Sequence, residues 1–263
     1  MKIISRIICV ILAVIMCAGL VACSSYNEPT GKARYDYKNS KTNYGTNIFM
    51  KYVEREIDSM KVEDFVPSSQ QSDYVLIKVK NYGDIVVLLR YDVAPVTVEN
   101  FKKLTAEKFF DGTVFHRVIE GFMIQGGTNT VNPDYDPEKE GSTTYLPKEA
   151  DSIKGEFNRN GVENNLRHYR GVISMARVGA ATDASQADKE RAYNSASSSF
   201  FIVHEYGASA KNLDGDYASF GYVLAGMDVV DAIAGCDVWG AGTDFPLPVE
   251  NIVIESVTFV EPK

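Results

Sequence analysis

The segment from Phe115 to Gly127, FHRVIEGFMIQGG, constrains the fold of this chain more than any other stretch. It places one arginine, Arg117, and one glutamine, Gln125, in apolar sequence that is punctuated by glycines. A charged side chain on a hydrophobic sheet is costly unless it has a partner. The pattern therefore predicts a pair of strands that carries a site.

Strand periodicity predicts how these two residues meet. Because side chains alternate between faces, the odd-numbered residues from 113 to 119, Arg117 among them, should share one face. The even-numbered residues, His116 among them, should share the other. A three-residue loop at 120–122 would place Gln125 directly across from Arg117, where its amide oxygen can hold the guanidinium. Spacing alone leaves open a purely structural Arg–Gln pair on a solvated sheet face.

Four other segments of the chain, one before Phe115 and three after Gly127, occur in an order that is typical of one family. They are YGDIVVLLRYDVAPVTVENF from Tyr82, GVISMAR from Gly171, SSFFIV from Ser198 and LDGDYASFGYVLAGMDVVDAI from Leu213. Together with FHRVIEGFMIQGG they resemble the cyclophilin-type peptidyl-prolyl cis-trans isomerases, and the match runs from about Tyr74 to Val260. Any one string could arise by chance, but their succession over most of the chain is specific.

The resemblance implies a mainly β fold, a closed antiparallel eight-stranded β-barrel capped by two α-helices. The sequence itself predicts an opening hairpin, with strands at 75–79 and 85–89. It also predicts one amphipathic helix that begins near Pro95 and closes at Gly112, and a second at Met227 to Ala234. The remaining short apolar runs between turn residues are typical of an antiparallel sheet curled on itself.

The family's site can be carried over position by position. The resemblance implies that Arg117 is the catalytic hydrogen-bond donor and that Gln125 steadies it. The apolar surface for proline would come from Phe122, Met123, Phe201 as its floor, and Leu213 as a side wall. Ala176 and Arg177 would present backbone groups to an extended peptide, and Tyr217 completes the predicted substrate-binding residues.

Four positions depart from the family's usual pattern. Ser199 replaces a glutamine, Arg177 an asparagine, Asn212 a tryptophan found in many eukaryotic members, and Tyr217 a histidine. The lost glutamine puts peptide affinity in question. The resemblance implies cyclosporin binding, and the missing tryptophan predicts that it is weaker than in sensitive members.

Prolyl isomerisation needs no nucleophile, metal or cofactor, and none is expected here. His116, His168 and His204 share no ligand spacing with one another or with a cysteine pair. The serine-rich run at 195–199 lacks the G-x-S-x-G turn of a hydrolase.

The beginning of the chain predicts a bacterial lipoprotein. Residues 1–22 look like a signal peptide, and Leu20 to Cys23 form a lipobox in which Cys23 becomes the lipid-bearing residue. An uncleaved N-terminal anchor is the alternative. Residues 23–72 are predicted to be a tether, in which 47–65 could be a short helix packed on the domain or part of the stalk. Residues 73–263 are expected to form the isomerase domain that the resemblance implies.

Charge and cysteine content limit the partners. Without the signal peptide, 25 Lys and Arg stand against 35 Asp and Glu, a formal net charge of −10, which opposes affinity for nucleic acid or anionic lipid heads. The lipid on Cys23 would therefore be the attachment to the cell membrane, facing outside the cytoplasm. Cys236 is then the one remaining thiol, so we expect no internal disulfide. We expect a monomer that acts on proline-containing polypeptides.

Three functions stay open at this point. The first is a membrane-tethered foldase for exported proteins, and the second is a non-catalytic proline-peptide binding module or assembly factor. A solute-binding lipoprotein is disfavoured because no two-lobed α/β pattern is present. The polar insertion at 179–197 is either a solvated loop or a wall that shapes what can enter.

Overall fold

The computed structural model describes residues 53–135 and 143–263. The predicted signal peptide, Cys23 and most of the predicted tether lie outside these residues. No helix among the described residues is both long and apolar enough to cross a membrane.

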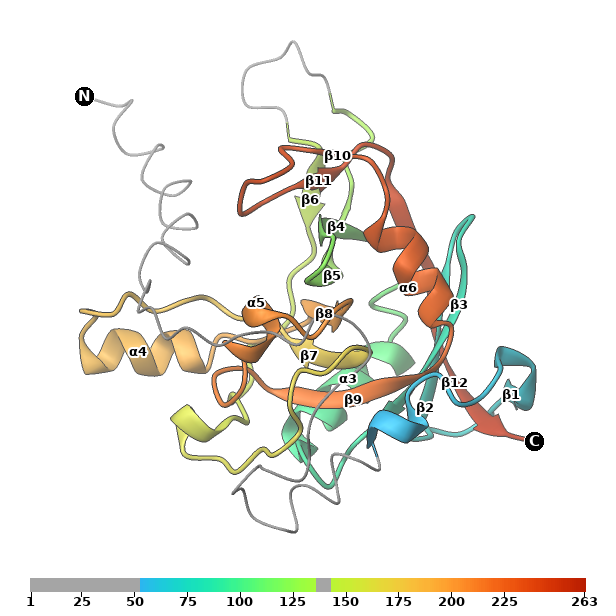
Figure 1. Cartoon of the computed structure of the whole chain (residues 1–263), viewed down its shortest axis with the longest axis horizontal. Coiled ribbons are helices and arrows are strands. Elements are labelled where there is room, and N and C mark those ends of the chain that lie inside the picture. Colours follow the sequence, from blue (N-terminus) through green and yellow to red (C-terminus); the bar gives the residue numbers. More distant parts are fainter. Residues whose placement is uncertain (1–52, 136–142) are drawn as a thin grey trace.

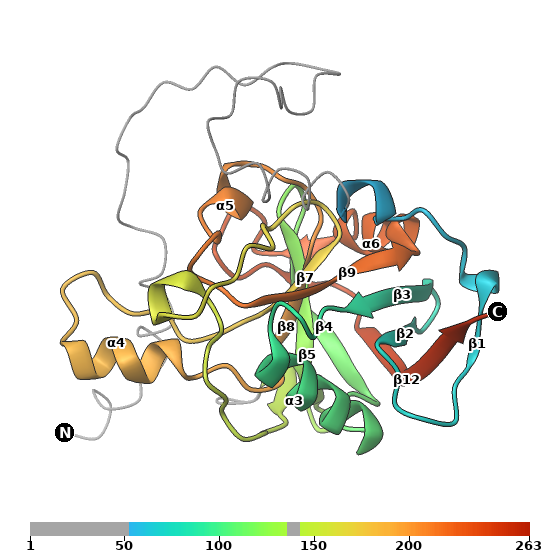
Figure 2. The same cartoon turned by 90° about the horizontal axis from the view of Figure 1, so that it is seen from below.

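A ring of eight antiparallel strands forms the centre of the molecule (Figures 1 and 2). In their order around the ring, the strands are β12 (Ile252–Pro262), β2 (Tyr74–Val79), β3 (Gly83–Leu89), β9 (Ser219–Ala225), β7 (Val172–Met175), β8 (Phe200–Val203), β5 (Met123–Val131) and β4 (Thr113–Ile119). The ring closes because β4 pairs with β12 through Ile252 opposite Phe115 and Val253 opposite Val114. The predicted mainly β cyclophilin-type fold is confirmed.

Shorter elements extend this ring. Two are strands on its outside: β1 (Phe65–Pro67) pairs with β12, and β6 (Tyr145–Pro147) pairs with β5. A separate two-stranded sheet consists of β10 (Val238–Trp239) and β11 (Leu247–Pro248). Two single-turn 3₁₀ helices, η1 (Val62–Asp64) and η2 (Asn158–Asn160), lie in the connections.

The barrel interior is filled by one side of each strand. Ile124, Ile202 and Ile173 are cross-strand partners on β5, β8 and β7, and all three belong to the main buried cluster. Paired residues of neighbouring strands point to the same face. The rows on either side of this one therefore point outward, and one of them carries the candidate site.

Two helices lie against the ring on opposite sides, α3 (Pro95–Ala106) and α6 (Met227–Ala234) (Figure 2). The bounds of α6 are as predicted. Helix α3 ends at Ala106 rather than at Gly112, because Lys108 adopts a left-handed φ of 53° that a helix cannot continue.

The first turn of α3 is held by a buried carboxylate. Glu156 is 3% exposed and accepts hydrogen bonds from the backbone N–H groups of Val96 and Thr97 and from the Thr97 hydroxyl. These N–H groups have no partner within the helix, and the positive end of the helix dipole also favours a carboxylate there. The long connection between β6 and β7 is thereby tied to the helix.

The segment before β2 packs on the domain in its described part. Val53 is fully buried, and the N–H groups of Asp58 and Met60 donate to the carbonyls of Val223 and Leu224 on β9. Of the two alternatives for residues 47–65, this favours packing over a stalk from Val53 onward. The boundary between tether and domain at 72/73 stays a prediction.

The insertion at 179–197 contains a helix that the sequence did not predict, α4 (Gln186–Tyr193). It projects from the barrel in both views, and of its residues only Ala192 is buried (Figures 1 and 2). Ser185 caps it by accepting from the N–H of Asp188. A further short helix, α5 (Ala208–Lys211), precedes Leu213.

Candidate active site

The β4–β5 hairpin has the predicted register. Arg117 pairs with Gln125 and Ile119 with Met123, which leaves a three-residue loop at 120–122. Gly121 takes a φ of 75° in this loop, a conformation that suits glycine. Its N–H donates to Nδ1 of His204, and this contact fixes the loop against the strand end of β8.

Strict alternation along β4 is wrong, because the strand bulges between Phe115 and Arg117. Phe115 pairs with Gly126 and Arg117 with the adjacent Gln125, so β4 contains one extra residue here. Phe115 and Val118 therefore both belong to the barrel core, whereas Arg117 does not share the face of Phe115. Gly126 fits opposite the bulge because a Cβ there would lie 2.8 Å from the carbonyl oxygen of Val114.

His116, between Phe115 and Arg117, is the extra residue of this bulge. Its Nδ1 is buried and has no hydrogen-bond partner in the described residues. Burial lowers the pKa of His116 to about 4, and the charge of the adjacent Arg117 acts in the same direction. The side chain is therefore neutral at pH 7.

The candidate site lies on the outer face of the sheet, along one cross-strand row. Arg117, Gln125, Phe201 and Ser174 are successive partners on β4, β5, β8 and β7. Neighbouring strands are roughly 4.8 Å apart, so the backbone of Arg117 is about 10 Å from that of Phe201. An extended arginine side chain can cover much of this distance.

Hydrogen bonds and an aromatic ring hold the guanidinium of Arg117. Nη1 donates to Oε1 of Gln125 at 3.0 Å, as predicted, and Nε donates to the backbone carbonyl of Asp244 at 2.7 Å. The ring of Phe245 lies 5.3 Å from Cζ, within the range of a cation–π interaction. Sequence reasoning missed Asp244 and Phe245, because they come from the distant loop between β10 and β11.

Ser199 extends this arrangement. Nε2 of Gln125 donates to its hydroxyl at 3.2 Å, and the hydroxyl lies 3.4 Å from the carbonyl oxygen of Gly126. The serine that replaces the family's usual glutamine therefore orients the amide that in turn orients Arg117. This role was not predicted.

The predicted apolar residues gather in one cluster beside this row. Met123, Phe201, Val203 and Ala210 are buried there. The partly buried members are Ile119, Phe122, Ala176, Tyr206, Leu213 and Tyr217. All six predicted apolar and aromatic residues, Phe122, Met123, Ala176, Phe201, Leu213 and Tyr217, are thus brought together.

Phe201 is a buried member of this cluster and packs against a buried histidine. The imidazole of His168 stacks against its ring at 5.9 Å with an interplanar angle of 18°. His168 is 1% exposed, and its two nitrogens lie 2.9 Å from a carboxylate oxygen of Asp214 and 3.0 Å from the hydroxyl of Ser174. Both ends of the supporting ring are therefore fixed.

Arg177 does more than the sequence predicted. Its guanidinium lies 5.1 Å from the rings of Phe157 and Tyr193 and 4.6 Å from that of Tyr217. Nε donates to the carbonyl of Asp216 and Nη1 to that of Val178. Since Tyr193 belongs to α4 and Tyr217 to the apolar cluster, this aromatic cage connects the insertion to the site.

The backbone at positions 176 and 177 is partly engaged. The N–H of Ala176 donates to the carbonyl of Ser199 at 2.9 Å, so a bound peptide would use other groups here. Asn212, at the position of the family's tryptophan, is exposed and ends helix α5.

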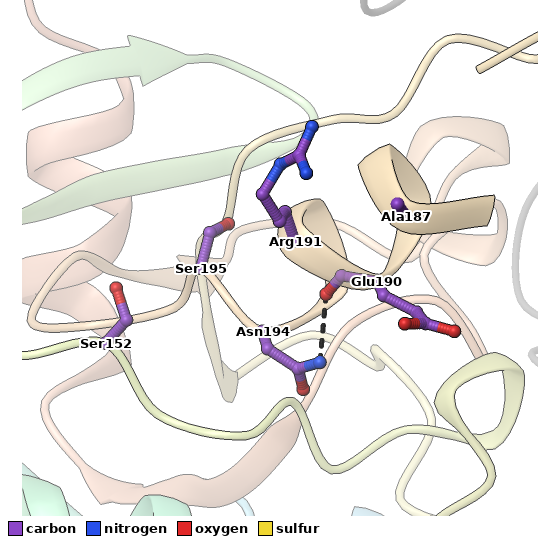
Figure 3. Close-up of a pocket in the computed structure, with 6 residues that line it drawn as sticks. All are labelled: Ser152, Ala187, Glu190, Arg191, Asn194 and Ser195. Carbon is purple, nitrogen blue, oxygen red and sulfur yellow. Dashed lines mark hydrogen bonds between the residues drawn. The ribbon is translucent and has the colours of Figure 1, made fainter. Parts of the chain in front are cut away.

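One open cavity lies away from this site, beside helix α4. It has a volume of about 620 Å³ and is lined by Ser152 and by residues of α4 and the loop after it: Ala187, Glu190, Arg191, Asn194 and Ser195 (Figure 3). None of these belongs to the predicted site, and the charged and polar lining does not suit a proline ring. Among the described residues, no group of three or more His, Cys, Asp and Glu side chains could hold a metal ion.

Comparison with known proteins identifies the family. The model of the family described as "Cyclophilin type peptidyl-prolyl cis-trans isomerase/CLD" matches residues 74–259. Peptidyl-prolyl cis-trans isomerase B of Escherichia coli is 38% identical over 186 residues, covering 69% of this chain and 96% of the relative. A peptidyl-prolyl cis-trans isomerase of Acinetobacter baylyi is 36% identical over 179 residues, covering 67% and 80%.

A solved structure agrees. The crystal structure of a cyclophilin-type peptidyl-prolyl cis-trans isomerase from Cryptosporidium parvum has a TM-score of 0.51 and 26% sequence identity, covering 73% of this chain and 98% of that chain. With the eight-stranded ring and the Arg117–Gln125 pair in place, the chain belongs to the cyclophilin-type peptidyl-prolyl cis-trans isomerases, a family of enzymes.

Proposed function

We propose that this chain isomerises X-Pro bonds of exported polypeptides at the outer side of the cytoplasmic membrane, with Arg117 as the catalytic donor. The observation that carries the proposal is the guanidinium of Arg117, oriented by Gln125 at 3.0 Å beside an apolar cluster. No covalent step, metal or cofactor takes part.

The barrier of about 20 kcal/mol comes from amide resonance, which rotation about the C–N bond breaks. In the twisted state the proline nitrogen becomes pyramidal and its lone pair can accept a hydrogen bond. A cationic donor at that nitrogen stabilises the twisted state more than either planar isomer. Such a charge-assisted bond supplies about 2–4 kcal/mol, roughly 30- to 1,000-fold in rate.

The apolar cluster has the complementary task. Phe122, Met123, Phe201 and Leu213 would receive the pyrrolidine ring and exclude water from the amide. A less polar surrounding favours the twisted state, which carries less charge separation than the planar amide, and it strengthens the bond from Arg117. Held by Gln125 and the Asp244 carbonyl, the guanidinium needs little rearrangement when the amide twists.

The cellular location is proposed from residues 20–23 alone. Leu20-Val21-Ala22-Cys23 would be processed so that Cys23 carries lipid, and the net negative charge leaves the lipid as the attachment to the membrane. Clients would then be extended chains that emerge on the outer side. Metabolic labelling with a palmitate analogue tests this, since Cys23→Ser should abolish both labelling and membrane retention; label that persists in this variant rejects the anchor.

The activity is tested with the full-length chain in detergent, in a protease-coupled assay on an X-Pro peptide. We expect Arg117→Ala to lower kcat/KM about 100-fold, the effect of losing ~2.7 kcal/mol of transition-state stabilisation. Arg191→Ala is the matched control, because Arg191 is an exposed arginine on α4 that pairs with Asp188 of the same helix.

The same assay separates the enzyme from a non-catalytic binding module. Peptide binding without acceleration by the wild-type chain would favour the module and reject catalysis. Acceleration that survives in Arg117→Ala would reject Arg117 as the donor while leaving isomerase activity intact.

A further inference from the structure

The loop that joins β10 to β11 reaches the candidate active site from a part of the sequence far from it. The N–H of Val118 donates to the carbonyl of Pro246 at 3.2 Å, which attaches the loop to β4 one residue beyond Arg117. The hydroxyl of Thr243 accepts from the N–H of Phe245 and donates to the carbonyl of Gly240, so the loop is also braced internally. These hydrogen bonds hold the loop in place beside Arg117.

Phe245 contacts Arg117 from the loop between β10 and β11. Its side chain is 45% exposed, although it is a large hydrophobic residue. It lies 5.3 Å from Cζ of Arg117, and the preceding carbonyl, that of Asp244, accepts from Nε of the same guanidinium. The ring of Phe245 and the carbonyl of Asp244 therefore contact the same guanidinium from the same loop.

These contacts constrain the guanidinium in complementary ways. The bonds to Gln125 and to the Asp244 carbonyl fix directions within its plane. An aromatic ring over a cation is attractive through the quadrupole of the ring, and it restricts tilting out of that plane. An arginine otherwise retains several rotatable bonds, whose ordering costs free energy at the moment of catalysis.

We propose that Phe245 is a positioning residue for the guanidinium of Arg117, which it holds by its aromatic ring for hydrogen bonding to the proline nitrogen. The inference rests on the proposed function for its catalytic consequence. The positioning itself is a property of the protein without substrate.

The test compares variants of the full-length chain in which the ring is altered in steps. Phe245→Leu retains apolar bulk and removes the ring, whereas phenylalanines with increasing fluorine substitution at position 245 retain the shape and progressively weaken the quadrupole. We expect Phe245→Leu to lower kcat about threefold with KM unchanged, equivalent to ~0.7 kcal/mol, and the fluorinated series to give intermediate losses in order of substitution. Trp239→Leu is the matched control, because Trp239 is an aromatic residue of the same hairpin that is 67% exposed.

A second measurement does not depend on activity. The order parameter of the Arg117 Nε–H group, from ¹⁵N relaxation, should fall in Phe245→Leu and stay unchanged in Trp239→Leu. A wild-type order parameter in Phe245→Leu, or a fluorinated series with constant kcat, overturns the inference; so does a loss confined to KM, which would make Phe245 a ground-state peptide contact. If the wild-type chain shows no isomerase activity, the proposed function fails, and the order parameter still decides whether Phe245 positions Arg117.

Discussion

Two arginines lie at opposite ends of the row of strands that carries the candidate site, and their surroundings differ. Arg117 on β4 lies beside the ring of Phe245 and is oriented by Gln125. Arg177, just after β7, is enclosed by the rings of Phe157, Tyr193 and Tyr217. The same side chain therefore serves as a positioned donor at one end and as a structural clamp at the other.

The difference teaches how this chain accommodates its insertion. A helix that projects from the barrel buries little apolar surface of its own, and α4 buries only Ala192. The cage around Arg177 attaches its last residue, Tyr193, to the cluster residue Tyr217. Arg177, at the position where the family usually has asparagine, thus stabilises the insertion. It does so at the opposite end of the strand row from Arg117.

The largest expected effect concerns the strand at the Arg117 end, through His116. Burial lowers the pKa of His116 in the folded chain to about 4. Above pH ~6.5 neither the folded nor the unfolded chain binds a proton at this side chain. Between pH ~6.5 and 4 only the unfolded chain does. The free energy of unfolding should therefore fall as the pH drops through this window, by up to about 3 kcal/mol.

Urea unfolding at a series of pH values measures this effect. His116→Asn, which cannot titrate at this position, is the control. Carboxylates and the other histidines titrate in both proteins, so their contributions cancel in the difference between the two curves. The wild-type curve should fall more steeply than that of the variant between pH 6.5 and 4; parallel curves would show that His116 carries no such penalty.

At the other end of the row, replacing Arg177 should mainly lower the free energy of unfolding. Arg177→Ala removes three cation–π contacts and two hydrogen bonds to carbonyls, so we expect the free energy of unfolding to drop by about 2 kcal/mol. Because Tyr217 loses its support, KM should rise severalfold while kcat stays within twofold. Thermal unfolding and the peptide assay report the two quantities separately, and Arg191→Ala on the exposed face of α4 should change neither. A loss in kcat comparable to that of Arg117→Ala would break the distinction between the two arginines.

The smallest expected effect concerns the support of Gln125. Ser199→Ala removes the acceptor at 3.2 Å from Nε2 of Gln125 and should lower kcat about threefold, equivalent to ~0.7 kcal/mol. In a Gln125→Ala background the same change should have no further effect, because the serine acts through the amide. Additive losses in this double-mutant cycle would mean that Ser199 contacts the peptide directly.

The sequence predicted the parts of the site that depend on short-range pattern. A three-residue loop sets the hairpin register, so the sequence alone predicts Gln125 opposite Arg117. The eight-stranded ring and the gathering of Phe122, Phe201 and Leu213 followed from the family resemblance rather than from periodicity.

What could not be predicted depends on geometry that the pattern does not carry. Alternation assigned Phe115 to the face of Arg117, but a bulge inserts a residue between them, and both Phe115 and Val118 then point inward. Asp244, in the loop with Phe245, contacts Arg117 from 127 positions away in the sequence. Nothing in the segment Asp244 to Pro246 indicates that it contacts an arginine on β4. Helix α4 is too polar to show helical periodicity, since only Ala192 is buried and Tyr193 packs against the core at its end.

One paired measurement tests the distinction between the two arginines most directly: kcat/KM and the free energy of unfolding for Arg117→Lys and Arg177→Lys in the full-length chain. Lysine retains the charge but loses the planar fork and the stacking face. The account predicts that Arg117→Lys lowers kcat/KM at least tenfold with stability unchanged, and that Arg177→Lys lowers stability with kcat unchanged. Full activity in Arg117→Lys would contradict it.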